Sequence, residues 1–105
     1  MERYAWKTQV KNGMLDVYIE RHANIWPELS QLLDEAGIHN YTIWNSGLDL
    51  FGYYECEYGI DHAQTIQANS EIVQKWNAYM EDIIELEMDP ETGAQPLMRQ
   101  VFFHK

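Results

Sequence analysis

A helical apolar pattern over residues 15–26, interrupted at Pro27, restricts the fold of this chain more than any other feature. Apolar and aromatic side chains recur there at intervals of three and four residues, which places them on one face of a helix. Because proline lacks the N–H that a helix interior needs, Pro27 is expected to interrupt this helix or to begin a new turn. A second apolar face then runs to Ala36, and Gly37 is expected to end it. The predicted buried stripe of the first helix comprises Leu15, Tyr18, Ile19, His22, Ile25 and Trp26.

The segments outside these helices alternate in the manner of strands. From Arg3 to Val10 the side chains alternate, with every second one from Tyr4 to Val10 on one face and the others on the opposite face, which predicts a strand. Further strands are predicted at 39–44 and 50–57, with a hairpin turn at 45–47, and a last strand at 97–103. Helical segments are predicted from about Asp61 and after Ser70, which is a suitable N-cap, followed by a loop at 89–93. The stripe of this last helix comprises Ile72, Val73, Trp76, Met80, Ile83 and Ile84.

The order strand, helix, strand, strand, helix, strand predicts an α+β fold. Such a split βαβ arrangement forms an antiparallel sheet with the helices on one face. The opposite face of the sheet then needs a cover, and a second copy of the chain would supply one. We therefore expect a homodimer.

Length and charge narrow the classes of function. The chain has 105 residues, which suits a single domain spanning 1–105. Its 17 acidic residues outnumber the 7 basic ones, giving a formal charge of -10 that argues against binding to nucleic acid or to an anionic membrane. The lone Cys56 excludes an intramolecular disulfide, and the sequence shows no signal peptide or membrane-spanning run. We expect a soluble cytoplasmic protein whose ligand is a small neutral molecule.

His22 is the leading candidate for chemistry, because imidazole titrates near neutral pH. A histidine on a buried stripe is more often structural than catalytic, so both interpretations stand on spacing alone. Tyr18 lies one turn earlier on the same face, and Tyr41 on the second strand could present its hydroxyl to the same pocket. Trp76 offers a flat surface that could stack on a sugar ring, although an aromatic residue on such a stripe is more often part of the core. These residues predict a pocket that moves protons on a neutral polar ligand.

Other kinds of site fit the sequence poorly. The four histidines are scattered, with no pair at the helical i, i+4 spacing typical of metal ligands, so no metal is expected. No serine has a nucleophile-elbow context, Cys56 sits within a predicted strand, and no glycine-rich phosphate loop occurs. We therefore expect chemistry without a cofactor and without a covalent intermediate.

Several motifs of the chain resemble those of the L-rhamnose mutarotases. The run RHANIWPEL at 21–29 is similar to the family hallmark RHxxIWPEL. The resemblance extends to HNY at 39–41, QKW at 74–76, YM at 79–80 and QVF at 100–102, and so covers almost the whole chain. It implies a ferredoxin-like α+β domain that dimerises as a dimeric α+β barrel, and an enzyme that interconverts the α and β anomers of L-rhamnose or a related sugar.

The resemblance also implies roles for individual residues. His22 falls on the proton-donating histidine of the family, Tyr18 and Tyr41 fall on sugar-binding tyrosines, and Trp76 falls on the first tryptophan of a pair that packs on the sugar. The second member of that pair is replaced here by Asn77, which could reshape the pocket or lie at its rim without effect. The partner base is not identified.

Three alternatives remain open at the level of the sequence. The first is the same chemistry on another sugar, such as L-fucose or L-lyxose. The second is a non-catalytic dimeric sugar-binding or regulatory domain of the same fold. The third is an oxygenase-like dimeric α+β barrel, which the hallmark motif disfavours.

Overall fold

The computed structural model describes residues 1–85 and 97–105, which form four helices, a 3₁₀ turn and one four-stranded sheet. The predicted loop at 89–93 lies outside the described residues. The elements are β1 (Glu2–Gln9), α1 (Leu15–Ala23), α2 (Pro27–Glu35), β2 (Ile38–Ser46), β3 (Asp49–Cys56), α3 (Ile60–Ala68), α4 (Glu71–Met80), the 3₁₀ turn Glu81–Ile83 and β4 (Leu97–Met98).

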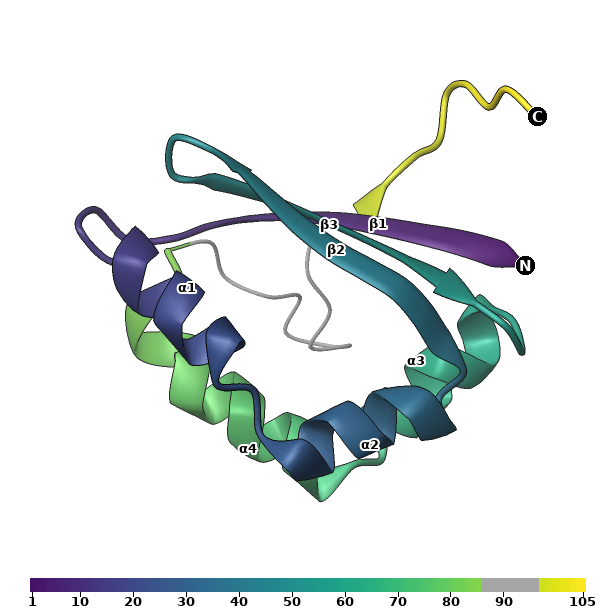
Figure 1. Cartoon of the computed structure of the whole chain (residues 1–105), viewed down its shortest axis with the longest axis horizontal. Helices are drawn as coiled ribbons and strands as arrows, with labels where there is room; N and C mark the ends of the chain where they lie inside the picture. The colour runs from purple at the N-terminus through teal and green to yellow at the C-terminus, as the bar shows by residue number, and fades with distance from the viewer. Residues whose placement is uncertain (86–96) are drawn as a thin grey trace.

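The strands follow the spatial order β2-β3-β1-β4, and every adjacent pair is antiparallel. β3 therefore lies between β1 and β2, which is the predicted split βαβ arrangement. All four helices cover the same face of the sheet (Figure 1). The α+β prediction is confirmed, and the helices cover one face of the sheet only.

Two strand predictions need correction. The last strand was expected over 97–103, but only Leu97 and Met98 pair with β1, and the chain beyond them leaves the sheet (Figure 1). The hairpin turn falls later than expected, because Asn45 and Ser46 still pair with β3. The turn lies instead at Gly47, whose φ of 60° is a value that glycine adopts without strain.

Pro27 divides the first helical region as predicted, since α1 ends at Ala23 and α2 begins at Pro27. Because α1 is so short, Ile25 and Trp26 lie in the connection and not on the helical stripe. Ile19 was expected to be buried, but 53 % of its surface is exposed. The fourth helix begins as predicted, with the Ser70 hydroxyl accepting a hydrogen bond from the N–H of Val73.

The core lies between the sheet and the helices. The alternation predicted for the first strand is confirmed, because Tyr4, Trp6, Thr8 and Val10 share one face and are all buried. The apolar stripe predicted for the last helix extends beyond that helix, which ends at Met80. Ile83 lies in the 3₁₀ turn that follows, and Ile84 forms a β-bridge with Val10. Within the described residues no helix is long and apolar enough to cross a membrane.

Candidate active site

A pocket of about 400 Å³ opens between the sheet and the helices that cover it. This volume lies within the usual range for small-molecule sites. The structure brings all five residues singled out in the sequence to its wall: Tyr18 and His22 from α1, Tyr41 from β2, and Trp76 and Asn77 from α4. Apolar side chains form most of the remaining wall, so a few polar groups face a largely apolar space. The other lining residues are Trp6, Ile25, Leu29, Leu33, Ile43, Gln67, Val73, Met80 and Ile84.

The His22 ring is held by its own helix. Its Nδ1 lies 2.9 Å from the carbonyl oxygen of Tyr18. A carbonyl oxygen can only accept, so Nδ1 carries the proton of the neutral ring, and Nε2 is left with a free lone pair. Burial lowers the pKa of His22 below its usual 6.5, and the hydrogen bond to the Tyr18 carbonyl opposes this only in part. The imidazole is therefore mostly neutral at pH 7.

Aromatic rings enclose the imidazole on two sides. The ring of Tyr18 stacks on it at 4.1 Å between centroids, and the indole of Trp76 meets it edge-on at 5.4 Å. Trp76 is in turn packed at 5.1 Å against Trp26, which the chain places just before Pro27. These contacts fix the plane of the imidazole and keep water from two of its sides.

The hydroxyl of Tyr41 is fixed by a residue two strands away. Its Oη accepts a hydrogen bond of 3.0 Å from Nε1 of Trp6. Because that lone pair is occupied by an N–H donor, the Tyr41 O–H remains able to donate to a ligand. Although 36 % of the residue is exposed, its hydroxyl end is buried, and this burial raises the pKa of Tyr41. Tyr41 is thus a protonated hydrogen-bond donor at neutral pH.

Gly52 makes the contact between Trp6 and Tyr41 possible. Trp6 on β1 pairs with Gly52 on β3, and its indole lies over that glycine on the way to β2. A Cβ at Gly52 would lie only 2.0 Å from Cε2 of the indole, so no larger residue fits beneath the ring. Because Gly52 has no side chain, the indole of Trp6 on β1 can lie across β3 and bond to Tyr41 on β2.

Asn77 lies in the pocket wall next to Trp76 and is partly buried. Its amide makes no hydrogen bond to the residues that the structure describes. A short amide at this place brings both a donor and an acceptor to the ligand space, where an indole would bring bulk and one donor. The departure from the family motif thus falls on the pocket itself.

Three contributors to the site were missed in the sequence. Trp6 was assigned only to one face of its strand, and Gln67 was not singled out at all. Gln67 lines the pocket and its amide also approaches the hydroxyl of Tyr54 at 3.4 Å. A polar residue one turn after the buried Ala63 was the available signal for Gln67, because it marks an amide on the inner face of α3.

Arg21 is the third missed contributor, and it supports the aromatic wall from behind. Its guanidinium lies 4.2 Å from the centre of the Tyr79 ring, and Nη1 donates to the Tyr79 carbonyl at 2.7 Å and to Asp82 at 2.9 Å. Tyr79 packs on both Trp26 and Trp76 at 5.3 and 5.7 Å. Arg21 therefore connects α1 to the end of α4 and steadies the rings that enclose His22.

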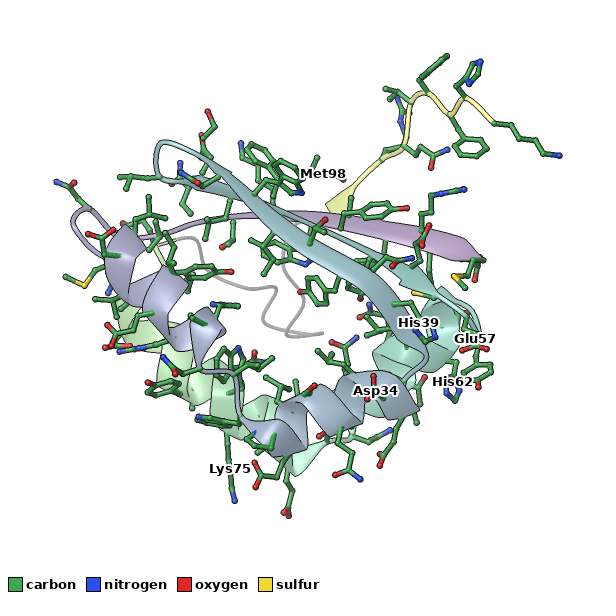
Figure 2. All side chains as sticks on the ribbon, viewed as in Figure 1. Asp34, His39, Glu57, His62, Lys75 and Met98 are labelled. Carbon is green, nitrogen blue, oxygen red and sulfur yellow. The ribbon has the colours of Figure 1, made fainter. Side chains whose placement is uncertain are left out.

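The remaining histidines lie elsewhere. His39 and His62 lie near Glu57 where β2 begins beside α3 (Figure 2), and Nε2 of His39 is 2.7 Å from the Glu57 carboxylate. Among residues 1–85 and 97–105, no three His, Cys, Asp or Glu side chains are grouped so that they could hold a metal ion. His22 is the histidine that lines the pocket.

Comparison with known proteins agrees with this architecture. A family model described as L-rhamnose mutarotase matches residues 3–104. The L-rhamnose mutarotase of Sinorhizobium fredii is 42 % identical over 99 % of this chain and 98 % of its own length, and that of Jannaschia sp. is 40 % identical over 92 % and 93 %. The crystal structure of an L-rhamnose mutarotase from Formosa agariphila matches with a TM-score of 0.82 at 32 % identity, and the match covers 100 % of both chains. This chain therefore belongs to the L-rhamnose mutarotase family.

Proposed function

We propose that this chain catalyses the interconversion of the α and β anomers of L-rhamnose, with His22 as the proton-transfer group. The observation that carries the proposal is the state of that imidazole: Nδ1 is committed to the Tyr18 carbonyl, and Nε2 is free in a half-buried pocket. Family membership over nearly the whole chain supports the substrate.

Mutarotation requires two proton movements and no change of oxidation state. The anomeric hydroxyl loses its proton as the bond between the anomeric carbon and the ring oxygen breaks, and the ring oxygen gains a proton. The open aldehyde turns about its bond to the next carbon, and the reverse steps close the ring on its other face. One general acid–base group contributes typically about 10²–10⁴-fold to the rate of such a step.

His22 can serve both proton movements through the same nitrogen. The neutral ring accepts a proton at Nε2, and the imidazolium so formed can return it to the sugar. The lowered pKa of His22 suits this cycle, because the resting ring is ready to accept and the charged ring readily gives the proton back. The proton-donating role expected from the family is then the second half of the cycle.

The other pocket residues bind the sugar or orient His22. Tyr41 donates its hydroxyl hydrogen to a sugar oxygen, and Tyr18 orients the imidazole through its ring and its carbonyl. Trp76 offers an indole to the apolar side of the sugar, and Asn77 offers an amide to a sugar hydroxyl. A 6-deoxysugar carries both kinds of surface, a methyl group and a set of hydroxyls.

Anomer exchange measured by saturation-transfer NMR tests the proposal. His22→Ala is expected to lose the enzymatic acceleration while the circular dichroism spectrum and the melting temperature stay close to those of the wild type. His62→Ala is the matched control, because His62 also lies on a helix but is exposed and outside the pocket. An exchange rate in His22→Ala equal to that of the control would refute the role of His22.

The identity of the sugar is the point at which Asn77 matters. If the amide selects a different substrate, L-fucose or L-lyxose will exchange faster than L-rhamnose. A non-catalytic sugar-binding domain would give a measurable dissociation constant without any acceleration of exchange. Anomer exchange measured with the three sugars, together with a titration that gives the dissociation constant of each sugar, separates these alternatives.

We also propose that a second copy of the chain covers the outer face of the sheet to form a dimeric α+β barrel from two ferredoxin-like units. The helices leave this face bare (Figure 1), and 69 % of Trp44 is exposed on it, opposite Phe51 of β3. Val101 and Phe102 beyond β4 are even more exposed. Apolar surface of this kind usually marks an interface. Analytical ultracentrifugation tests the dimer, and Trp44→Glu is expected to shift the protein toward monomer.

A further inference from the structure

Strand β2 contains a β-bulge immediately before Tyr41. His39 pairs with Glu55, and the next paired residue of β2 is Thr42, which pairs with Tyr53. Two residues of β2 thus lie between these pairs, but only one residue of β3. Two residues of β2, Asn40 and Tyr41, therefore stand opposite the single Tyr54. One extra residue in a strand shifts all later side chains to the opposite face, because side chains alternate with a period of two.

The bulge decides which face Tyr41 occupies. Ile38 is buried on the helix-covered face, and in a regular strand Asn40 would share that face while Tyr41 would share the outer face with His39. With the extra residue, Tyr41 and Ile43 both line the pocket, and Asn40 is exposed. Removal of the bulge would exchange a pocket hydroxyl for an amide.

Asn40 has the backbone conformation that the bulge requires. Its φ is +51°, and it is the single non-glycine residue with positive φ among residues 1–85 and 97–105. Asparagine tolerates this left-handed region better than most residues, whereas β-branched residues resist it.

A carboxylate on the neighbouring strand ties the bulge in place. Nδ2 of Asn40 donates to Oε1 of Glu55 at 2.5 Å, and the hydroxyl of Tyr53 donates to Oε2 at 3.0 Å. The bond from Asn40 crosses from β2 to β3 at the position where the regular ladder is interrupted, and the bond from Tyr53, within β3, holds the Glu55 carboxylate that receives it. The side chain of Asn40 thus replaces part of the pairing that the bulge removes.

We propose that Asn40 and Glu55 are positioning residues for the reaction, holding the bulge that turns the Tyr41 hydroxyl toward His22 and the sugar. Neither side chain lines the pocket, so each acts through Tyr41. The inference rests on the proposed mutarotase function for its effect on rate, but its structural part stands apart from that function.

Backbone-compatible and backbone-incompatible substitutions at Asn40 test the proposal. Asn40→Val resists positive φ and is expected to lower the anomer-exchange rate by on the order of 100-fold, the size of effect that a displacement of about 1 Å can have on a reacting group. Asn40→Gly adopts the same φ without strain and is expected to keep most of the rate. Asn45→Val is the matched control, since Asn45 is an exposed asparagine of the same strand with a side-chain hydrogen bond and no positive φ.

The indole N–H resonance of Trp6 gives a readout that does not depend on activity. This N–H donates to Tyr41, so Tyr41→Phe defines where the resonance moves when the bond is lost. Asn40→Val is expected to move it to that position. Glu55→Ala and Asn40→Gly, which both remove the bond between Asn40 and Glu55 but allow the positive φ, are expected to move it only part of the way, and Asn45→Val is expected to leave it in place.

The outcomes separate the two proposals. An Asn40→Val protein with both a wild-type rate and an unmoved Trp6 resonance would overturn the positioning role. If Asn40→Val does not fold, Glu55→Ala decides in the same way. A wild-type protein that does not accelerate exchange would refute the proposed function, while the Trp6 resonance would still decide whether Asn40 places Tyr41.

Discussion

Substitution of Gly52 by alanine tests whether the indole of Trp6 is seated where the structure places it. A Cβ at Gly52 would lie 2.0 Å from Cε2 and 2.3 Å from Nε1 of Trp6. Carbon atoms do not approach a ring this closely, and the indole is rigid and almost fully buried. The ring must therefore move, and the atom that moves with it is the donor of the bond to Tyr41.

The cost of Gly52→Ala follows from two terms. Overpacking of a well-filled core costs typically about 1–3 kcal/mol. Loss of the hydrogen bond between Trp6 and Tyr41 adds about 1 kcal/mol. The sum, about 2–4 kcal/mol of unfolding free energy, corresponds to a fall in melting temperature of roughly 8–16 °C at about 4 °C per kcal/mol for a domain of this size.

Urea and thermal unfolding followed by circular dichroism measure this cost, and a double-mutant cycle with Trp6→Phe assigns it. A phenyl ring is smaller than an indole, so Gly52→Ala is expected to cost at least about 1 kcal/mol less in the Trp6→Phe background. If Gly52→Ala alone changes stability by less than about 0.5 kcal/mol, the size of an ordinary surface substitution, the indole does not lie on Gly52 and the account of Tyr41 fails.

Three further predictions concern the pocket and its support. The exchange rate is expected to fall as the pH drops through the lowered pKa of His22, because the neutral ring must accept the first proton. The folding stability that the neutral ring contributes is fully present above the unfolded pKa of 6.5 and is lost as the pH falls from there to the lowered pKa. A rate that rises on acidification would show that the imidazolium is the working form. Arg21→Ala is expected to lower the melting temperature and to raise KM more than it lowers kcat, because Tyr79 loses the cation over its ring, while Arg21→Lys keeps the charge and should lose less; equal effects of the two variants on KM would contradict this. Asn77→Trp is expected to raise exchange of L-rhamnose relative to L-fucose and L-lyxose if the amide sets the substrate, and an unchanged ratio of rates would place Asn77 outside the selection.

Features set by neighbouring residues could be predicted from the sequence. The two faces of β1 follow from alternation, the boundary at Pro27 follows from the missing N–H, and the start of α4 follows from the hydroxyl of Ser70. The errors arise where a pattern continues past the element that carries it. Ile25 and Trp26 fit the helical spacing, but α1 ends at Ala23, before either of them. The apolar residues after Met98 resemble a strand, but they pair with none of the residues that the structure describes.

In the candidate site, too, some contacts could be predicted from the sequence and others could not. His22 and Tyr18 are one helical turn apart, and the hallmark motif contains the histidine, so their neighbourhood is visible in the sequence. Trp6 and Gly52 meet only through the register of β1 on β3, and no local pattern reports that a glycine must lie beneath an indole. The bulge at Asn40 is equally hidden, because regular alternation alone would have placed Tyr41 on the outer face.

His22 and Tyr41 are held by different parts of the structure, so substitutions should disturb them in different ways. His22 is oriented by a contact inside its own helix, whereas Tyr41 depends on β1, β2 and β3 together. A substitution that disturbs the sheet, such as Gly52→Ala or Asn40→Val, should therefore lower the exchange rate while leaving the pH midpoint of the remaining activity unchanged, because the burial that sets the pKa of His22 comes from α1 and the aromatic wall. Arg21→Ala should do the opposite: by loosening the wall it should admit water and move that midpoint back toward 6.5. A common shift of the midpoint in both kinds of variant would mean that the imidazole and the tyrosine hydroxyl are held by one structure and not by two.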